Sequence, residues 1–352
     1  MPLKVVIVGA GIAGLAAAIA LHKSGHDVLQ SRFHNEVGAA ISLAPNATRV
    51  LGSLGLDLEG LQAVHCDGAW VWNAMGERLL RTALTKDVQA ALQMSDSWLL
   101  THRVDLHDAL RAEATKDVDG KRIGIILASR VASVDSELGL VRLEDGTSTR
   151  SRSVSAIGLD GVKAFLAPDC RLVMYPCRQG HLLNCAAIHP ADSETTAKYS
   201  FWLDSGSVDD LVSTFQDFSP EIQQPCRLAE DLKLWSLVCR RPPRTFVKGK
   251  LALIGDAAHP ILPHQGQGGA QAFEDVAALS TLLPSAAIPE QISERLSFDR
   301  DVLTSQVPNE RWGEILETLR TYVPDAEVPE DMRAYTWSSY PARKAEKLLA
   351  AL

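Results

Sequence analysis

Residues 3–25 read LKVVIVGAGIAGLAAAIALHKSG. The run over 3–8 is mostly apolar and β-branched, which is typical of a parallel strand buried on both faces. The Ala- and Leu-rich run after Gly14 predicts a helix, and Gly25 predicts its end because glycine accepts a positive φ without a Cβ clash. A second strand is expected over 26–29. This order of strand, tight turn, helix and strand predicts an α/β fold.

The three glycines of the turn predict a dinucleotide site. Gly9 allows the tight turn, Gly11 lets the backbone approach a pyrophosphate, and Gly14 lets the helix and the strand pack closely. The start of the helix then offers free N–H groups and a positive dipole end to the phosphates. The alternative is a tight turn without a ligand. Such units usually carry an Asp or Glu after the second strand for the ribose, but this chain has Gln30 there and no carboxylate before Glu36.

Bulk composition narrows the class of protein. The chain has 352 residues, of which 46% are hydrophobic and 22% charged, as expected for a soluble protein of two packed domains. Its net charge is −8 and no long basic cluster occurs, so a nucleic-acid partner is not expected. The apolar run over 5–21 contains three glycines and therefore indicates a buried strand and helix rather than a membrane span.

Cysteine usage indicates a reducing, intracellular compartment. The six cysteines include no CxxC pair and lie in or beside apolar sequence. We expect reduced, partly buried thiols in a cytoplasmic protein, and no metal site.

Two further stretches predict turns or helix starts that could contact a ligand. Residues 37–56 read VGAAISLAPNATRVLGSLGL, which predicts a turn at Gly38-Ala39, a short strand, and a helix that starts at Pro45 with Asn46 as its N-cap. Arg103 stands at a second predicted helix start, where its guanidinium suits a phosphate or a ribityl hydroxyl. The alternative for Arg103 is a solvated surface charge.

Residues 251–283 read LALIGDAAHPILPHQGQGGAQAFEDVAALSTLL. Asp256 directly follows a short apolar strand, and ligands of α/β sheets bind at that carboxyl edge. Gly266, Gly268 and Gly269 precede an amphipathic helix, so its N-terminus is sterically open and rich in N–H donors. Such an end can stabilise the negative charge of a reduced flavin ring.

These stretches occur in a fixed order and together resemble the FAD-dependent aromatic hydroxylases. The stretches are VVIVGAGIAGL, GAAISLAPNATRVL, THRVDLH and GDAAHPILPHQGQGGAQAFED. The family comprises class A flavoprotein monooxygenases, including salicylate hydroxylase-like, p-hydroxybenzoate hydroxylase-like and fungal biosynthetic enzymes of secondary metabolism. The resemblance extends from residue 3 to about residue 290. It implies bound FAD, held by Gly9, Gly11, Gly14, Gly38, Ala39, Arg103, Asp256, Pro263, Gly266, Gly268 and Gly269.

The resemblance also implies an activity. NAD(P)H would reduce the flavin, and O₂ would then form a C4a-hydroperoxide that hydroxylates a small phenolic substrate. Only one GxGxxG is present, so NAD(P)H would be a transient co-substrate without a domain of its own. No catalytic residue is assigned. His259, His264 and Tyr175 are candidates for a base or donor, and a structural role is the alternative for each.

The implied architecture is a Rossmann-like FAD domain with an inserted, mostly antiparallel β-sheet substrate domain and C-terminal helices. The FAD domain would take up 1–65, 98–165 and 245–285, and the substrate domain 66–97 and 166–244. Residues 286–352 would be the helical segment. Strands are expected over 172–175, 182–188 and 199–203. Trp70 and Trp72 share a strand face and line either a pocket or the core.

The chain departs from the family in its middle. Family members carry Asp-Gly followed by Ser and Arg, whereas Asp160-Gly161 is followed by Ala164 and no Arg. The connections around it are also short. A deletion form, a degenerate member and a chain recorded only at its ordered residues are three explanations. A non-catalytic binding protein and another FAD- or NAD(P)-dependent oxidoreductase, such as a dehydrogenase, are therefore kept as rival functions.

Overall fold

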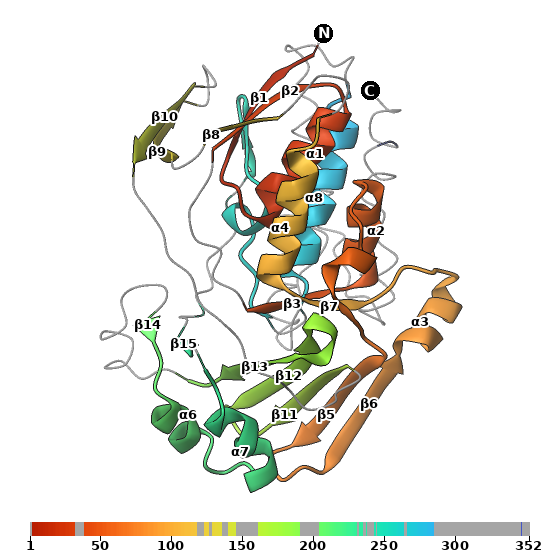
Figure 1. The fold of residues 1–352 in the computed structure, drawn as a ribbon, viewed down its shortest axis with the longest axis vertical. Coiled ribbons are helices and arrows are strands. Elements are labelled where there is room, and N and C mark those ends of the chain that lie inside the picture. Colours follow the sequence, from red (N-terminus) through yellow and green to blue (C-terminus); the bar gives the residue numbers. More distant parts are fainter. Residues whose placement is uncertain are drawn as a thin grey trace.

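The fold is seen in a computed structural model of the chain. It describes residues 2–31, 39–117, 123–126, 129–135, 140–145, 161–190, 204–230, 232–234, 237, 243, 245–263, 266–284 and 346. Its elements form two bodies of secondary structure, one around a group of packed helices and one around a five-stranded sheet (Figure 1).

The N-terminal unit is the predicted strand, turn, helix and strand. Strand β1 (Lys4–Val8) leads into helix α1 (Ile12–Lys23), and β2 (Asp27–Ser31) returns parallel to β1. Strand β8 (Gly124–Ile126) joins on the other side of β2, again parallel. Because α1 is apolar on every side, eight of its twelve residues are buried.

Three more helices share one hydrophobic core with α1. They are α2 (Pro45–Ser53), α4 (Arg103–Ala114) and α8 (Gly268–Leu282). Figure 1 shows α1, α4 and α8 side by side, and one hydrophobic core joins their buried faces. A small antiparallel sheet lies at one end of these helices. It consists of β3 (Ala40–Leu43), β7 (Leu99–His102) and β4 (Val64–His65), and the short helix η1 (Glu59–Leu61) precedes β4.

The second body is a five-stranded sheet in the order β13-β12-β11-β5-β6. Its β11–β5 pairing is parallel and the other three pairings are antiparallel. The prediction of a mostly antiparallel sheet is therefore confirmed. Helix α3 (Thr85–Leu92) follows β6, and α6 (Val208–Thr214) and α7 (Pro220–Arg227) pack against one face through Phe215 and Ile222. The strands are β5 (Gly68–Asn73), β6 (Arg78–Leu84), β11 (Val162–Leu166), β12 (Arg171–Cys177) and β13 (Leu182–Ile188).

Strand β11 corrects one expected boundary. The sequence placed residues up to 165 in the FAD domain, but β11 (Val162–Leu166) lies between β5 and β12. Gly161 makes this possible, because a Cβ there would come within 2.3 Å of the Gly68 carbonyl oxygen. The Asp-Gly element therefore leads into the five-stranded sheet. The rest of the division into domains stays a prediction, and the strand expected over 199–203 lies outside the described residues.

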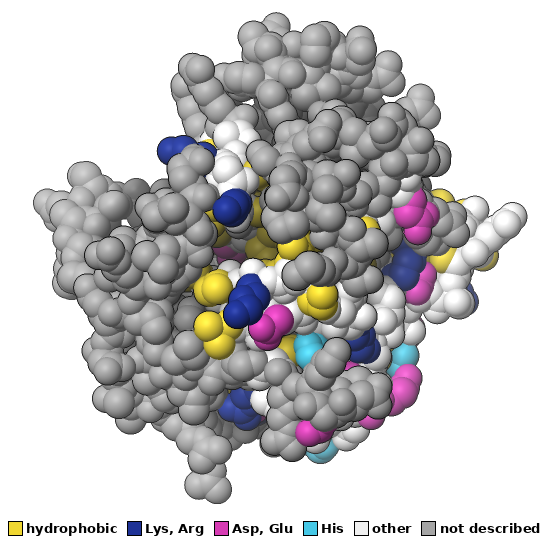
Figure 2. All heavy atoms as spheres, turned by 90° about the horizontal axis from the view of Figure 1, so that it is seen from above, with side chains coloured by type: hydrophobic (Ala, Val, Ile, Leu, Met, Phe, Trp, Pro, Cys, Tyr) yellow, Lys and Arg dark blue, Asp and Glu magenta, His cyan; other side chains and the backbone are white. Residues whose placement is uncertain are grey.

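The remaining described strands form small pairs. They are β9 (Ser129–Asp135) with β10 (Leu140–Asp145), β14 (Asp204–Ser205) with β15 (Lys233–Leu234), and β16 (Val247–Lys248) with β17 (Leu251–Ala252). No helix in the described ranges is long and apolar enough to cross a membrane. On the face seen in Figure 2, the described Lys and Arg side chains are scattered among acidic and hydrophobic ones.

Candidate flavin site

The first glycine turn has the geometry that its sequence predicts. Gly9 has a φ of +101° and open space within 4 Å of where a Cβ would be. Gly11 is the N-cap of α1, and because it has no side chain it cannot cap the helix N–H groups. A Cβ on Gly14 would lie 2.1 Å from the Gly9 carbonyl oxygen, so only glycine allows this approach of helix and strand. The turn thus leaves space for a ligand at Gly9, while at Gly14 it packs directly against its own backbone.

Gln30 supports this turn from the protein side. Its side chain is fully buried and Nε2 donates to the Gly9 carbonyl oxygen at 3.2 Å. Its Oε1 has no partner among the described residues. Gln30 therefore contacts the turn itself, a role that the sequence did not predict because the contact depends on the pairing of β2 with β1.

The GDAAHP motif packs between two helices. Gly255 has a φ of +56°, and a Cβ there would lie 3.2 Å from the Ala13 Cβ on α1 and 3.3 Å from the Ala272 Cβ on α8. The short helix η3 (Gly255–Ala257) therefore brings Asp256 to the place where the two glycine-rich helix starts lie close together. Asp256 is exposed there, as a cofactor contact requires.

His259 is bound to Asp275 rather than directed at a substrate. Its Nε2 lies 2.8 Å from the Asp275 Oδ2, which also accepts the Gly255 N–H at 2.7 Å. Burial lowers the pKa of His259, but the hydrogen bond and charge of Asp275 outweigh it and raise that pKa above its ordinary value. Burial raises the pKa of Asp275, and His259 opposes this in part. These contacts support the structural alternative for His259.

The second glycine turn lies against the short sheet. Gly266 has a φ of +62°, and Gln267 caps α8 without a side-chain hydrogen bond to the helix. A Cβ on Gly268 would meet nothing within 4 Å, whereas one on Gly269 would lie 2.9 Å from the Ile41 Cδ1 on β3. Pro263, just before this turn, is exposed, while the catalytic candidate His264 lies outside the described residues.

The start of β3 is held by three other elements. The Arg103 N–H at the start of α4 donates to the Ala39 carbonyl oxygen at 3.0 Å. Tyr175 Oη donates to the Ala40 carbonyl oxygen at 2.9 Å, and the Ala40 N–H donates to the Asn184 Oδ1 at 3.1 Å. Burial raises the pKa of Tyr175, so its hydroxyl stays a donor in this contact and a structural role is favoured. Gly38 lies outside the described residues.

Two contacts around α4 were not expected from the sequence. The buried His107 Nε2 lies 2.7 Å from the Ala10 carbonyl oxygen and so joins α4 to the first glycine turn. Arg178, in the turn between β12 and β13, binds both carboxylate oxygens of Asp105, each at 2.8 Å. Its φ of +49° places it in the left-handed region, which costs energy for a non-glycine residue.

Asn46 corrects another expectation. Helix α2 begins at Pro45 after an Ala44 N-cap, so Asn46 lies inside the first turn and does not cap it. Its buried amide instead contacts α8: Nδ2 lies 2.7 Å from the Glu274 Oε1. A partner 228 residues away leaves no local signal in the sequence.

Together these residues fit FAD. The open positions at Gly9 and Gly268 allow close approach of a ligand, and neither the α1 nor the α8 start has a side-chain cap in the described residues. Uncapped helix starts leave N–H donors for an anionic group. Gly9, Gly11 and Gly14 would hold the pyrophosphate, and the turn before α8 would hold the flavin ring. No group of described His, Cys, Asp or Glu side chains could hold a metal ion.

Two domain families match the parts that form this site. Residues 7–42 match the family described as NAD(P)-binding Rossmann-like domain, and residues 222–296 match the family described as FAD binding domain. The match at each end covers one of the two glycine turns.

The chain is also similar to proteins of known activity. It is 30% identical to FAD-dependent monooxygenase phomE' of Diaporthe leptostromiformis, over 86% of this chain and 87% of that protein. It is 29% identical to hispidin-3-hydroxylase of Neonothopanus nambi, over 84% and 83%. Identity to 3-hydroxybenzoate 6-hydroxylase of Polaromonas naphthalenivorans is 27%, over 80% and 79%.

Solved structures share the fold. FqzB matches with a TM-score of 0.70 at 21% identity, covering 99% of this chain and 93% of that one. CtdE, solved with FAD and a substrate, matches with a TM-score of 0.72 at 18% identity, covering 99% and 98%. The two glycine turns and the Asp256 turn between their helices agree with this similarity. The chain therefore belongs to the FAD-dependent aromatic hydroxylases, a family of flavin monooxygenases.

Proposed function

We propose that this protein hydroxylates a small phenolic substrate, with FAD bound and with NAD(P)H and O₂ as co-substrates. The observation that carries the proposal is the position of Gly255 between α1 and α8, where an added Cβ would lie within 3.3 Å of side chains of both helices. This packing gathers two uncapped helix starts and the Asp256 turn at one place. When bound, FAD would supply the electron transfer and the activation of O₂.

The chain's own residues have separable tasks in this proposal. Backbone N–H groups at the start of α1 bind phosphate, and those at the start of α8 stabilise negative charge on the reduced ring. Asp256 and Arg103 bind the ribityl and phosphate part. His259 and Asp275 hold the GDAAHP turn in place, because Asp275 binds both the His259 ring and the Gly255 N–H.

The five-stranded sheet supplies a surface for an aromatic ring. Tyr175 reaches Ala40, so the sheet face that carries Tyr175 is turned toward β3. Successive side chains of a strand alternate between faces, which places Val173 and Ala164 on this face and leaves Leu172 on the other. Val173 and Ala164 are half-buried and apolar, whereas Leu172 is buried in the core with α6 and α7. A planar apolar substrate would lie against this face.

An isotope experiment tests the proposal. The purified protein, reconstituted with FAD, is given NADH or NADPH and a panel of small phenols under ¹⁸O₂. We expect flavin absorption bands, substrate-stimulated oxidation of the nicotinamide, and one ¹⁸O atom in the product. A yellow protein that consumes NAD(P)H but places no ¹⁸O in any phenol would contradict the proposed reaction.

A further inference from the structure

Four polar side chains are buried together beneath the Gly266–Gly269 turn. They are Asn46, Gln267, Gln271 and Glu274, and none is more than 6% exposed. The Asn46 Nδ2 donates to the Gln267 Oε1 at 3.1 Å and to the Glu274 Oε1 at 2.7 Å. The Gln271 Nε2 donates to the Glu274 Oε2 at 3.1 Å. Both oxygens of this buried carboxylate therefore accept an amide N–H, which offsets part of its desolvation.

Asn46 makes these contacts at a cost. Its Oδ1 is buried without a partner among the described residues. An unsatisfied buried acceptor destabilises a protein, because no hydrogen bond replaces those it made to water. The amide thus keeps Nδ2 directed at two acceptors of α8 while its oxygen stays unpaired, and such an exception asks for an explanation.

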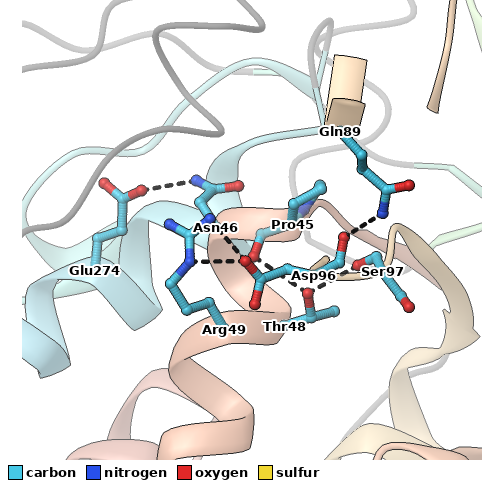
Figure 3. Close-up of polar contacts among 8 residues, drawn as sticks. All are labelled: Pro45, Asn46, Thr48, Arg49, Gln89, Asp96, Ser97 and Glu274. Atoms are coloured by element: carbon cyan, nitrogen blue, oxygen red, sulfur yellow. Dashed lines mark hydrogen bonds and ion pairs between the residues drawn. The ribbon is translucent and has the colours of Figure 1, made fainter. Parts of the chain in front are cut away.

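The same helix turn is anchored on its other side. Figure 3 shows Asn46 pointing to Glu274, while Arg49 and Thr48 of α2 reach the segment that precedes β7. The Arg49 Nε donates to the Asp96 Oδ2 at 3.0 Å, and Thr48 Oγ1 donates to the Ser97 carbonyl oxygen at 2.8 Å. The first turn and a half of α2 thus makes polar contacts with α8 on one side and with residues 96 and 97 on the other.

This segment is connected to the substrate side. The Gln89 side chain on α3 donates to the Asp96 carbonyl oxygen, and α3 directly follows β6 of the five-stranded sheet. The start of α8 is therefore fixed relative to the same part of the chain that continues from the edge of that sheet.

We propose that Asn46 is a positioning residue for the flavin ring: its Nδ2 ties Gln267, the N-cap of α8, to Glu274 and so fixes the Gly266–Gly269 turn relative to the substrate side. The proposal rests on the proposed function, because it takes this turn as the ring-binding element. A displacement of about 1 Å between reacting groups can cost about 100-fold in rate. Asn46 touches neither reactant in this account and acts through Gln267.

Three variants test the proposal. Asn46→Asp removes the donor and sets two carboxylates against each other. Asn46→Asp with Glu274→Gln restores one hydrogen bond of reversed polarity, because the introduced amide on α8 then donates to the introduced carboxylate on α2. The matched control is Gln223→Met in α7, since the Gln223 amide is also buried and donates to two carbonyl oxygens, those of Gln216 and Phe218. It lies in the core beside α6, among residues that take no part in the proposed flavin site.

The readouts are the Kd of FAD, the visible circular dichroism of the bound flavin, and the product formed per NAD(P)H oxidised. We expect Asn46→Asp to weaken FAD binding by about tenfold or more and to lower the product yield per NAD(P)H. The double variant should recover most of both, and Gln223→Met should lower only the melting temperature.

Two results would overturn the proposal. One is an Asn46→Asp protein whose flavin dichroism and whose product yield per NAD(P)H (its coupling) both equal those of the wild type. The other is an equal loss of coupling in Gln223→Met, which would show that lower stability alone explains it. A wild-type protein that binds no FAD would overturn the proposed function and this proposal with it, whereas a coupled wild type with an unaffected Asn46→Asp overturns this proposal alone.

Discussion

Tyr175 and Asn184 stand opposite one another across β12 and β13, and between them they bind both backbone polar groups of Ala40. Ala40 opens β3, and the residue before it, Ala39, is bound by the start of α4. The five-stranded sheet is thus attached to the helical body at β3, the strand beside the turn that we propose binds the flavin ring. The ion pair of Arg178 with Asp105 makes a second attachment nearby.

Removing one side of this attachment should weaken the other. We expect Tyr175→Phe to lower the free energy of unfolding by about 1 kcal/mol, because the Ala40 carbonyl oxygen loses its donor while the ring packing stays. Asn184→Ala should cost a similar amount. Urea unfolding of both single variants and the double variant measures the coupling, and we expect a double variant that loses less than the sum. Strict additivity would show that Ala40 is not held by the two side chains together.

The first glycine turn gives a prediction with a built-in control. We expect Gly14→Ala to abolish FAD binding and to destabilise the fold by several kcal/mol, because its Cβ would lie 2.1 Å from the Gly9 carbonyl oxygen. Gly52, also in a helix interior, has no atom within 4 Å of a Cβ. Gly52→Ala should therefore leave binding intact and raise stability by about 0.5–1 kcal/mol. Thermal unfolding and FAD titration check both, and a stable, yellow Gly14→Ala protein would refute the packing argument.

The His259–Asp275 pair predicts how stability changes with pH. The folded-state pKa of His259 is raised, so its contribution is fully present below the unfolded-state pKa and is lost as pH rises through the folded-state value. The raised pKa of Asp275 acts in the same direction at lower pH. We expect the free energy of unfolding to fall as pH rises above about 6.5.

Asp275→Asn isolates the cause of that slope. Without the carboxylate, burial lowers the pKa of His259 and its strongest opposing interaction is gone, so the slope above pH 6 should flatten or reverse. Urea unfolding between about pH 5.5 and 8.5, a range that spans the ordinary pKa of histidine, measures this slope. An unchanged slope in Asp275→Asn would assign the pH dependence to other groups.

The Arg178–Asp105 pair should contribute modestly to stability. Its side chains are 30% and 25% exposed, so solvent screens the pair and Asp105→Asn should cost about 0.5–1 kcal/mol. Arg178→Gly also loses the pair but relieves the positive φ at that position, so we expect it to be less destabilising than Arg178→Ala. Chemical unfolding of the three variants checks this order. Equal losses in Arg178→Gly and Arg178→Ala would show that the turn is unstrained.

The sequence predicted the parts of this protein that depend on local geometry. Gly9 and Gly14 have the conformation and the contact expected of them, because the tight turn and the close packing of helix and strand can both be inferred from the glycine spacing. The predicted mostly antiparallel sheet is confirmed as well, since three of its four strand pairings are antiparallel.

Contacts between distant segments could not be predicted in this way. The sequence predicts Asn46 as a local N-cap, but its partner Glu274 is 228 residues away. His107 contacts the Ala10 carbonyl oxygen, 97 residues away, and nothing in the sequence around it indicates this contact. The expected boundary at 165/166 divides β11 (Val162–Leu166) between two domains, because a short apolar strand does not reveal which sheet it will join.

Gln30 has a consequence for any attempt to make this chain look more like its family. Introducing the acid expected after the second strand at position 30 would set a carboxylate oxygen against the Gly9 carbonyl oxygen, where an N–H donor now lies 3.2 Å away. Two acceptors would then repel each other in a buried place, and the first glycine turn would lose the hydrogen bond that supports it. A neutral amide at position 30 is thus a compatibility requirement of this backbone, and an acid cannot replace it there without removing the donor to Gly9.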